Sequence, residues 1–403
     1  MRRLSSDSEL IGGQPMFKLL ARANELQAQG KEILHFEIGE TNFASPPEVI
    51  DSAVNALQSG KTHYVPSVGI PELRDKVCEF INKEYGFKPL REQVLICPGN
   101  AVIYFAIKCI VDRTFDVIYP DPGFSTWLSA IKLCRANAVP VQLKEKHGFR
   151  LQAEDIKPLI NEYTRMIIVH SPSNPTGAVM NGKEIRDAFI VAEESDLYIL
   201  SDEAYSQLTY GEKHYSPSIY DKCKERTILL GSFSKAYAMT GWRLGFCVAP
   251  VEVIEKMNLL FQTIFSCFPP FIQWAGITAL ESSGYYNRLM LKQFLKCRDL
   301  IVDGLNNIKG IHCVRPQGTT YVFPNISETG LTSKQFADLM LEKAGIALLP
   351  GSDFGKYGEG YVRLCFANSE ENITKALNKM KEVLSDTTRK IHRNTEICST
   401  SMR

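Results

Sequence analysis

The sequence predicts an α/β fold built on a mainly parallel central sheet with helices on both faces. Apolar runs of strand length alternate with stretches of helical spacing through the middle of the chain, a pattern typical of parallel sheets. The apolar run 166–170 is continuous, as expected for a strand buried on both faces. Turns rich in Gly, Pro and polar residues follow these runs, at the positions where open α/β sheets bind ligands.

The composition limits the class of protein. The 403 residues are 44% hydrophobic, enough for a large core and two domains. Lys and Arg number 46 against 45 Asp and Glu, which argues against a nucleic-acid or acidic-membrane partner. No run approaches the roughly 20 apolar residues of a membrane helix. No apolar stretch follows the N-terminal arginines, so we expect no signal peptide.

The spacing of the cysteines also limits the class of protein. The 11 cysteines are scattered and none has Cys-x-x-Cys spacing, so the sequence suggests neither a zinc site nor a disulfide framework. We therefore expect a reduced, cytoplasmic enzyme without a bound metal.

Apolar spacing places the individual elements. Strands are expected over 33–38, 94–97, 117–119, 166–170, 197–200, 227–230, 244–249, 320–323 and 361–367. Helices are expected over 15–29, 47–58, 102–111, 251–262, 272–280, 285–307 and 333–344. The tail from Thr387 is polar and basic without apolar periodicity, so we expect it to be disordered or loosely packed.

Lys235 lies in a loop between two expected strands. Ser232 and Ser234 precede it, and Arg243 follows eight residues later. Taken alone, a loop lysine is most often a solvated surface charge. Hydroxyls, loop amides and a guanidinium together suit a phosphate group. A lysine amine beside a phosphate site suggests a Schiff base to pyridoxal phosphate.

The run from Gly231 to Arg243 resembles the lysine signature of the class I and II aminotransferases, the fold-type-I pyridoxal-phosphate enzymes. Its Ser-x-Ser-Lys core is followed by Thr-Gly-Trp-Arg-Leu-Gly, and five further segments match the family in the same order over residues 15–385. The resemblance implies an aminotransferase that uses pyridoxal phosphate as cofactor, with Lys235 as the catalytic lysine.

The resemblance also implies two domains. We expect residues 1–46 to form an N-terminal arm and part of the small domain, 47–284 the large cofactor-binding domain, and 285–386 the rest of the small α/β domain. The small domain is then built from both chain ends. Residues 387–403 would be a polar, flexible tail.

Two matching segments concern the cofactor ring. Asn174, in Asn-Pro-Thr-Gly, matches the family asparagine on the phenolic oxygen, and the prolines and glycine fix its turn. Asp202 ends an expected strand and matches the carboxylate beside the ring nitrogen. Opposite charge raises the pKa of that nitrogen and keeps the ring an electron sink. Tyr205 shares the phenolic oxygen, whereas Glu203 is expected to point to the other face.

Further segments match the phosphate and stacking positions. Gly99, followed by Asn100 and Ala101, lies between a strand and a helix, and the amides and positive dipole end of such a turn suit a phosphate. Phe124 follows a Pro-x-Pro-x turn and matches the aromatic side chain stacked on the cofactor ring. Trp127, one helical turn later, is expected only to pack.

Substrate-binding positions also match. Gly39 resembles the glycine whose backbone amide faces the substrate carboxylate, although Thr41 and Asn42 depart from the family turn. Arg363 lies inside an apolar strand, where an unpaired charge is very costly. It matches the arginine that holds the substrate α-carboxylate, next to Asn174; a buried ion pair is the alternative.

Tyr64 implies a second copy of the chain. It matches a tyrosine that reaches the cofactor phosphate of the other subunit, so the resemblance implies a homodimer with shared active sites. The alternative is a tyrosine packed in a turn.

Three activities are open at this point. The first is an aminotransferase that moves an amino group from an amino acid to a 2-oxo acid. The second is a pyridoxal-phosphate lyase, cyclase or decarboxylase with the same anchors, because a fold does not fix a reaction. The third is a cofactor-binding regulator, a class that carries a DNA-binding module ahead of the enzyme-like domain; the roughly 14 residues before Pro15 are too few for one.

The stretch 259–270 bears on the amino donor. Aspartate-specific members commonly bind the side-chain carboxylate here with an arginine from the partner subunit. This stretch has no Arg or Lys and three phenylalanines. Such a lining would desolvate a second carboxylate without pairing it. We therefore expect a neutral donor with an aliphatic, thioether or aromatic side chain.

Overall fold

The computed structural model describes residues 4–282 and 284–400, together with their side chains except those of Asp7 and 386–400. The chain divides into two compact units. Unit 1 comprises Met1–Gly13, Glu40–Gln293 and Pro316–Thr319, and unit 2 comprises Gln14–Gly39, Phe294–Arg315 and Thr320–Arg403. These units differ from the domains expected from the sequence mainly in assigning 1–13, 40–46, 285–293 and 316–319 to unit 1.

Unit 1 is built on a seven-stranded sheet with the order β2-β8-β7-β6-β5-β3-β4. Neighbours from β7 to β4 pair in parallel, and β8 is antiparallel to both β2 and β7. The sheet is therefore mainly parallel, as predicted. Its strands are β2 (Val94–Ile96), β3 (Asp116–Asp121), β4 (Asn137–Gln142), β5 (Thr164–His170), β6 (Tyr198–Asp202), β7 (Thr227–Ser232) and β8 (Gly245–Val248).

Burial follows position in this sheet. In the interior strand β5, Met166, Ile167, Ile168 and Val169 are buried on both faces, which explains their continuous apolar run. The edge strand β4 is more exposed and contains Pro140, a residue that an edge tolerates because one side of the strand needs no ladder donor.

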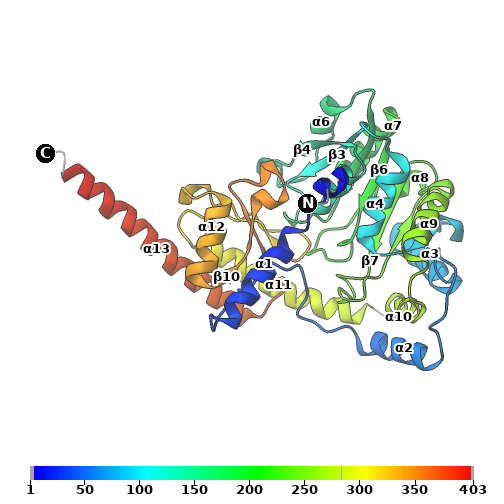
Figure 1. Ribbon diagram of the computed structural model, residues 1–403, viewed down its shortest axis with the longest axis horizontal. Helices are drawn as coiled ribbons and strands as arrows, with labels where there is room; N and C mark the ends of the chain where they lie inside the picture. Colours follow the sequence, from blue (N-terminus) through cyan, green and yellow to red (C-terminus); the bar gives the residue numbers. More distant parts are fainter. Residues whose placement is uncertain (1–3, 283, 401–403) are drawn as a thin grey trace. The chain divides into compact units, whose positions relative to one another are not determined.

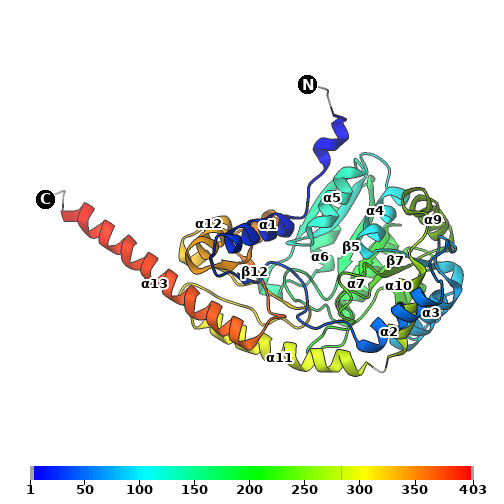
Figure 2. The ribbon, with the colours of Figure 1, turned by 60° about the horizontal axis from the view of Figure 1, so that its bottom comes forward.

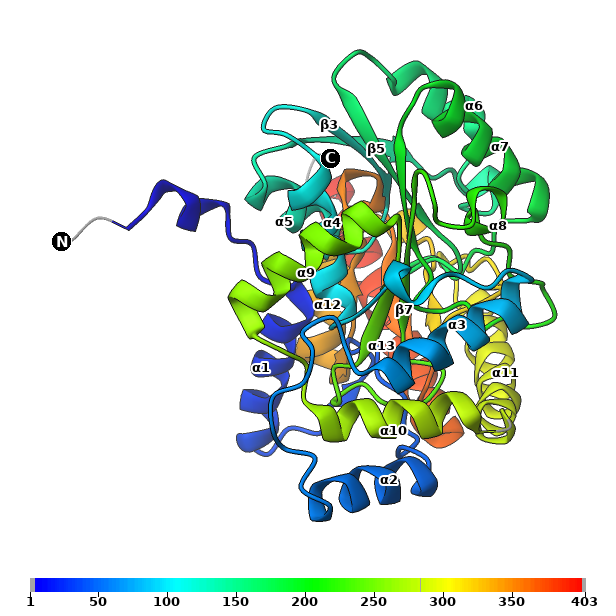
Figure 3. The ribbon, with the colours of Figure 1, turned by 90° about the vertical axis from the view of Figure 1, so that its right-hand side faces the viewer.

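Helices cover both faces of the sheet. Figure 2 shows α4, α5 and α9 on one side and α3, α7 and α10 on the other. In Figure 3, α2 lies beside α10, against which it packs. The helices are α2 (Pro47–Gln58), α3 (Pro71–Tyr85), α4 (Gly99–Ile110), α5 (Ser125–Leu133), α6 (Ala153–Ile156), α7 (Gly182–Glu194), α8 (Ser218–Asp221), α9 (Val251–Phe265) and α10 (Pro270–Glu281).

Two glycines allow a close approach of backbones at one end of the sheet. A Cβ built on Gly245 would lie 2.9 Å from both the Gly231 oxygen and the Gly99 nitrogen. A Cβ on Gly231 would lie 2.1 Å from the ring of Phe246. Side chains at these positions would force β7, β8 and the start of α4 apart, so glycine is required for their spacing.

Unit 2 contains two small sheets. β1 (Leu34–His35) pairs in parallel with β10 (Ile346–Ala347). The other sheet has the order β11-β12-β9 and is antiparallel, with β9 (Tyr321–Val322), β11 (Leu349–Pro350) and β12 (Val362–Cys365).

The helices of unit 2 are α1 (Pro15–Ala28), α12 (Ser333–Leu339) and α13 (Glu370–Thr400), and α11 (Tyr285–Asn306) runs from unit 1 into unit 2. Figure 1 shows α13 in red as one continuous helix. The backbone of the tail is thus helical to Thr400, a structure that its lack of apolar periodicity did not predict. Its side chains lie outside the described residues, so the looseness of its packing stays a prediction. Within the described part of the chain, no helix is long and apolar enough to cross a membrane.

Candidate active site

The carboxyl ends of β5 and β6 bring two polar side chains together. His170 ends β5, Asp202 ends β6, and the two residues are paired in register. Both are buried. Because parallel strands expose their carboxyl ends at the same sheet edge, loops after β5, β6 and β7 can converge there.

Asp202 is a buried carboxylate that the protein surrounds with neutral donors. The indole N–H of Trp127 donates to Oδ2 over 3.2 Å, and the amide of Ala204 donates to Oδ1 over 3.3 Å. The imidazole Nδ1 of His170 lies 3.7 Å from Oδ1. Among the described residues, no Lys or Arg forms an ion pair with Asp202. A positively charged group of a ligand could therefore form an ion pair with the Asp202 carboxylate.

Asn174 is held in the turn after β5. Its backbone N–H donates to Nε2 of His170 over 2.9 Å, and Gly177 N–H donates to the Ser173 carbonyl over 2.8 Å. Asn174 is buried, so the turn and its surroundings fix the position of this residue.

Lys235 follows β7 and faces Tyr205. Its Nζ lies 5.8 Å from the centroid of the Tyr205 ring, and Tyr205 is itself buried. Two residues of the same loop, Ala238 and Arg243, have φ values of 51° and 59°. A left-handed conformation at residues other than glycine is costly and is found mostly where the surrounding structure enforces it.

The phosphate-binding candidates lie around the start of α4. A Cβ built on Gly99 would lie 4.0 Å from Ser232 Oγ, so the glycine turn and this hydroxyl are neighbours. The amide of Ser234 donates to the same Ser232 Oγ over 3.2 Å. Asn100 and Ala101 form the first turn of α4. The Ala101 amide donates to the Pro98 carbonyl over 2.9 Å. The start of α4 and the Ser232 hydroxyl nevertheless lie together, an arrangement that suits an anion.

Arg243 is exposed on the loop that carries Lys235. Its Nη1 donates to the Thr240 carbonyl over 2.6 Å. The described contacts do not join its guanidinium to Ser232 or Ser234. Its assignment to the phosphate stays a prediction.

Phe124 and Trp127 lie at the start of α5, and Trp127 contacts Asp202. Their rings meet edge to face, with centroids 6.2 Å apart and an interplanar angle of 87°. Trp127 is fully buried, whereas Phe124 is partly exposed, and its ring remains available for stacking.

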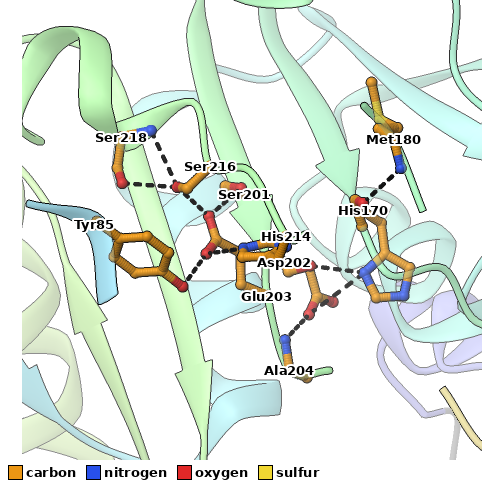
Figure 4. Close-up of polar contacts among 11 residues, drawn as sticks. Tyr85, His170, Met180, Ser201, Asp202, Glu203, Ala204, His214, Ser216 and Ser218 are labelled. Atoms are coloured by element: carbon orange, nitrogen blue, oxygen red, sulfur yellow. Dashed lines mark hydrogen bonds and ion pairs between the residues drawn. The ribbon is translucent and has the colours of Figure 1, made fainter. Parts of the chain in front are cut away.

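Glu203 points away from Asp202, as predicted. Figure 4 shows the two carboxylates on opposite sides of the end of β6. Glu203 accepts hydrogen bonds from Tyr85, His214, Ser201 and Ser216. Burial and the neighbouring Glu203 raise the pKa of Tyr85 well above its usual value, so the phenol stays a donor. This cluster ties β6 to α3 and to the loop before α8.

Unit 2 holds the expected carboxylate-binding residues. Arg363 is buried in β12, where its guanidinium carbon lies 4.3 Å from the Tyr321 ring centroid and 4.9 Å from that of Phe354. Its Nη2 donates to the backbone oxygen of Glu37. A Cβ on Gly39 would lie 1.7 Å from the Tyr321 hydroxyl, so only glycine fits there. Gly39 and Arg363 are thus arranged around the same tyrosine.

Tyr64 is 88% exposed in the loop between α2 and α3. It is not packed in its turn, which removes the alternative raised from the sequence. Within the described residues, the structure does not place it with Lys235 or Asp202.

Two side chains that contact the predicted site residues were not expected there from the sequence. Trp127 was expected only to pack, yet its indole donates to Asp202. His170 was assigned no role, yet it contacts both Asp202 and Asn174. A polar residue at the last position of a buried strand was the available signal for His170. No sequence signal marked Trp127, because its contact depends on how α5 packs on the sheet. No group of three metal-ligating side chains occurs in the described ranges.

Comparison with known proteins agrees with this geometry. Residues 31–380 match the model of the family "Aminotransferase class I and II". The chain is 38% identical over 378 residues to an aspartate aminotransferase of Pyrococcus horikoshii, covering 93% of this chain and 95% of that one. It is 36% identical to an aromatic-amino-acid aminotransferase 2 of Thermococcus litoralis, covering 95% and 98%. The structure of aspartate aminotransferase from Thermus thermophilus with maleate superposes with a TM-score of 0.91 at 32% identity, covering 95% and 100%.

The chain therefore belongs to the class I and II aminotransferase family and has the fold-type-I architecture. It is an aminotransferase, the first of the three activities left open by the sequence.

Trp127→Phe tests whether the indole donor matters to Asp202. Phenylalanine keeps most of the packing but leaves Oδ2 one donor short, and a hydrogen bond to a charged group is worth about 1.5–3 kcal/mol. We expect kcat/KM to fall ~10- to 100-fold with the fold retained. Trp274→Phe on α10, outside the site, is the matched control and should leave kcat/KM unchanged. An unchanged rate in Trp127→Phe would return Trp127 to a packing role.

Proposed function

We propose that the chain binds pyridoxal 5′-phosphate at the carboxyl ends of β5, β6 and β7 and uses it to move an amino group from an L-amino acid to a 2-oxo acid. Members of this family use that cofactor. The observation that carries the proposal is Asp202, a buried carboxylate whose described partners are all neutral or weakly basic groups. The protonated ring nitrogen of the cofactor is a cation of the right kind to pair with it.

The other ring contacts follow from the same edge of the sheet. Asn174 and Tyr205 would donate to the phenolic oxygen, and Phe124 would stack on the ring. Gly99, Asn100, Ala101, Ser232 and Ser234 would hold the phosphate through amides and hydroxyls, with Arg243 and Tyr64 supplying charge and a further hydroxyl. The closeness of Gly99 to Ser232 supports the phosphate assignment.

The chemistry divides between the cofactor and the protein. When bound, pyridoxal phosphate supplies a cationic ring that takes up the electron pair left when Cα of the donor loses its proton. Lys235 would take that proton on Nζ and return it to the cofactor carbon C4′, acting first as base and then as acid. Asp202 would keep the proton on the ring nitrogen. Arg363 would hold the α-carboxylate bidentately, with Gly39 and Asn174 as further contacts.

Lys235→Ala should abolish turnover, because it removes the amine that would hold the cofactor and take the Cα proton. It should also remove the visible absorption of the cofactor bound to the lysine, although the phosphate contacts can still retain pyridoxal phosphate. Turnover and absorption spectra check both effects. Lys224→Ala, an exposed lysine elsewhere in unit 1, is the control. Retained activity in Lys235→Ala would contradict the proposal as a whole.

We also propose a homodimer with shared sites. Large apolar side chains are exposed on α2 and at the end of α9, in addition to the exposed Tyr64. Exposed apolar surface of this kind is a common mark of a protein interface. The side chains concerned are Ile50, Val54, Leu57, Leu259, Ile264 and Phe265. A second copy would cover them and receive Tyr64 at its cofactor phosphate. The cytoplasmic location stays a prediction.

Mixed dimers test the shared site. Tyr64→Ala and Lys235→Ala subunits each lack one part of the machinery. In a heterodimer, one of the two sites has an intact lysine from one subunit and an intact tyrosine from the other. We therefore expect mixing to restore part of the activity, measured after co-refolding the two variants. A fully active monomer in sedimentation would count against the dimer.

The amino donor is proposed to be neutral. The relatives include both aspartate and aromatic-amino-acid aminotransferases at similar identity, so their names do not decide. The rings of Phe261 and Phe265 stack with their centroids 5.5 Å apart. Phe261 and Phe268 are buried, so the rings of Phe261 and Phe268 belong to the chain's own core. Leu259, Ile264 and Phe265 remain exposed, and the stretch 259–270 contains no Arg or Lys that could pair with a second carboxylate.

Donor specificity is checked by kcat/KM for aspartate, phenylalanine, methionine and leucine with 2-oxoglutarate as common acceptor. A neutral donor should be preferred, because an apolar pocket gains about 0.8 kcal/mol for each buried methylene and cannot pair a carboxylate. A preference for aspartate of tenfold or more, about 1.4 kcal/mol, would show that a cation from elsewhere completes the pocket.

A further inference from the structure

His170 has a buried position between two residues of the proposed cofactor site. It ends β5, and its imidazole is enclosed by the rings of Trp127 and Tyr205, with centroids at 5.0 and 6.2 Å. Figure 4 shows its contacts to Asp202 at the end of the neighbouring strand. The only acidic side chain that faces it among the described contacts is Asp202.

Both ring nitrogens of His170 contact backbone groups, and this determines where the proton lies. Nδ1 is 2.8 Å from the carbonyl oxygen of Asp202, which can only accept. Nε2 is 2.9 Å from the amide of Asn174, which can only donate. Nδ1 must therefore carry the hydrogen, and Nε2 must be bare. A doubly protonated ring would set two N–H groups against each other at Asn174.

We propose that His170, held neutral with its hydrogen on Nδ1, is a positioning residue that fixes Asp202 and Asn174 together. One imidazole then sets the distance between the partner of the ring nitrogen and the partner of the phenolic oxygen. This inference rests on the proposed function, because it assigns those two roles to Asp202 and Asn174.

The neutral imidazole of His170 also leaves the negative charge of the Asp202 carboxylate unpaired by a neighbouring cation. Nδ1 lies 3.7 Å from Oδ1 of Asp202. A cationic imidazole at that distance would form an ion pair with the carboxylate and compete with the cofactor's ring nitrogen. Because the Asn174 amide occupies Nε2, the carboxylate keeps its charge for the ligand.

Three substitutions separate the two hydrogen bonds. In glutamine the amide nitrogen and oxygen lie beyond Cγ, so His170→Gln can offer one donor and one acceptor, as the ring does. In asparagine both amide atoms are attached to Cγ, so His170→Asn can reach the Nδ1 position but not the Nε2 position. His170→Met fills the space and offers neither.

The pH titration of the bound cofactor's visible absorption is the readout, since a merely structural change would not move its midpoint. A hydrogen bond that the Asn174 side chain would donate to the phenolic oxygen of the bound cofactor would stabilise the anionic oxygen, and so would lower the midpoint. We expect the midpoint to rise by about half to one pH unit in the Asn and Met variants, the size of one lost hydrogen bond. The Gln variant should stay close to wild type.

Two controls make the result specific. Ser171→Ala removes the buried hydrogen bond, 2.9 Å long, that the Met180 amide donates to Ser171 Oγ. It leaves Asp202 and Asn174 unchanged. It should lower thermal stability and leave the midpoint unchanged. In an Asn174→Ala background, His170→Asn should add no further shift, because the two act through the same contact.

The outcomes are distinguishable. An unchanged midpoint in folded Asn and Met variants, or an equal shift in the Gln variant, would overturn the inference. If the Met variant does not fold, the Asn and Gln pair decides. Absence of any visible absorption when pyridoxal phosphate is added to the wild-type protein would instead contradict the proposed function itself.

Discussion

The rest of the site depends on one electrostatic constraint: Asp202 is buried, and none of the Lys or Arg side chains that the structure describes is paired with it. Removing a carboxylate from water costs several kcal/mol unless hydrogen bonds or a cation offset it. The protein supplies an indole, a backbone amide and a neighbouring imidazole. These stabilise the anion only in part, so the fold maintains a carboxylate that a cationic ligand would complete. A core built for stability alone would place an apolar residue there.

The surrounding backbone is arranged to keep this carboxylate at the sheet edge. Register between β5 and β6 sets His170 beside Asp202, and the Glu203 N–H donates to the Leu230 carbonyl of β7 over 3.0 Å. Glu203 anchors the opposite face of the same strand end through hydroxyl and imidazole donors. The positive φ values at Ala238 and Arg243 show that the loop carrying Lys235 is also held in a costly conformation.

Much of this could be predicted from the sequence, because the signals are local. Apolar runs located every strand of the large sheet except β4, and the turns after them contained Lys235, Asp202 and Asn174. Residues whose role comes from packing were not predictable. Trp127 reaches Asp202 only because α5 packs over the strand ends. Pro316–Thr319 belongs to unit 1 through contacts with Gly177 and Leu208, far away in the sequence. The tail lacked apolar periodicity, yet its backbone is helical to Thr400.

The most direct test of the central claim is the turnover rate of Asp202→Ala. If Asp202 keeps the ring nitrogen protonated, its removal should lower kcat by about a thousandfold or more, about 4 kcal/mol, while circular dichroism shows the fold retained. Asp202→Glu, which keeps the charge but moves it, should retain part of the rate. A wild-type rate in a folded Asp202→Ala variant would contradict the account.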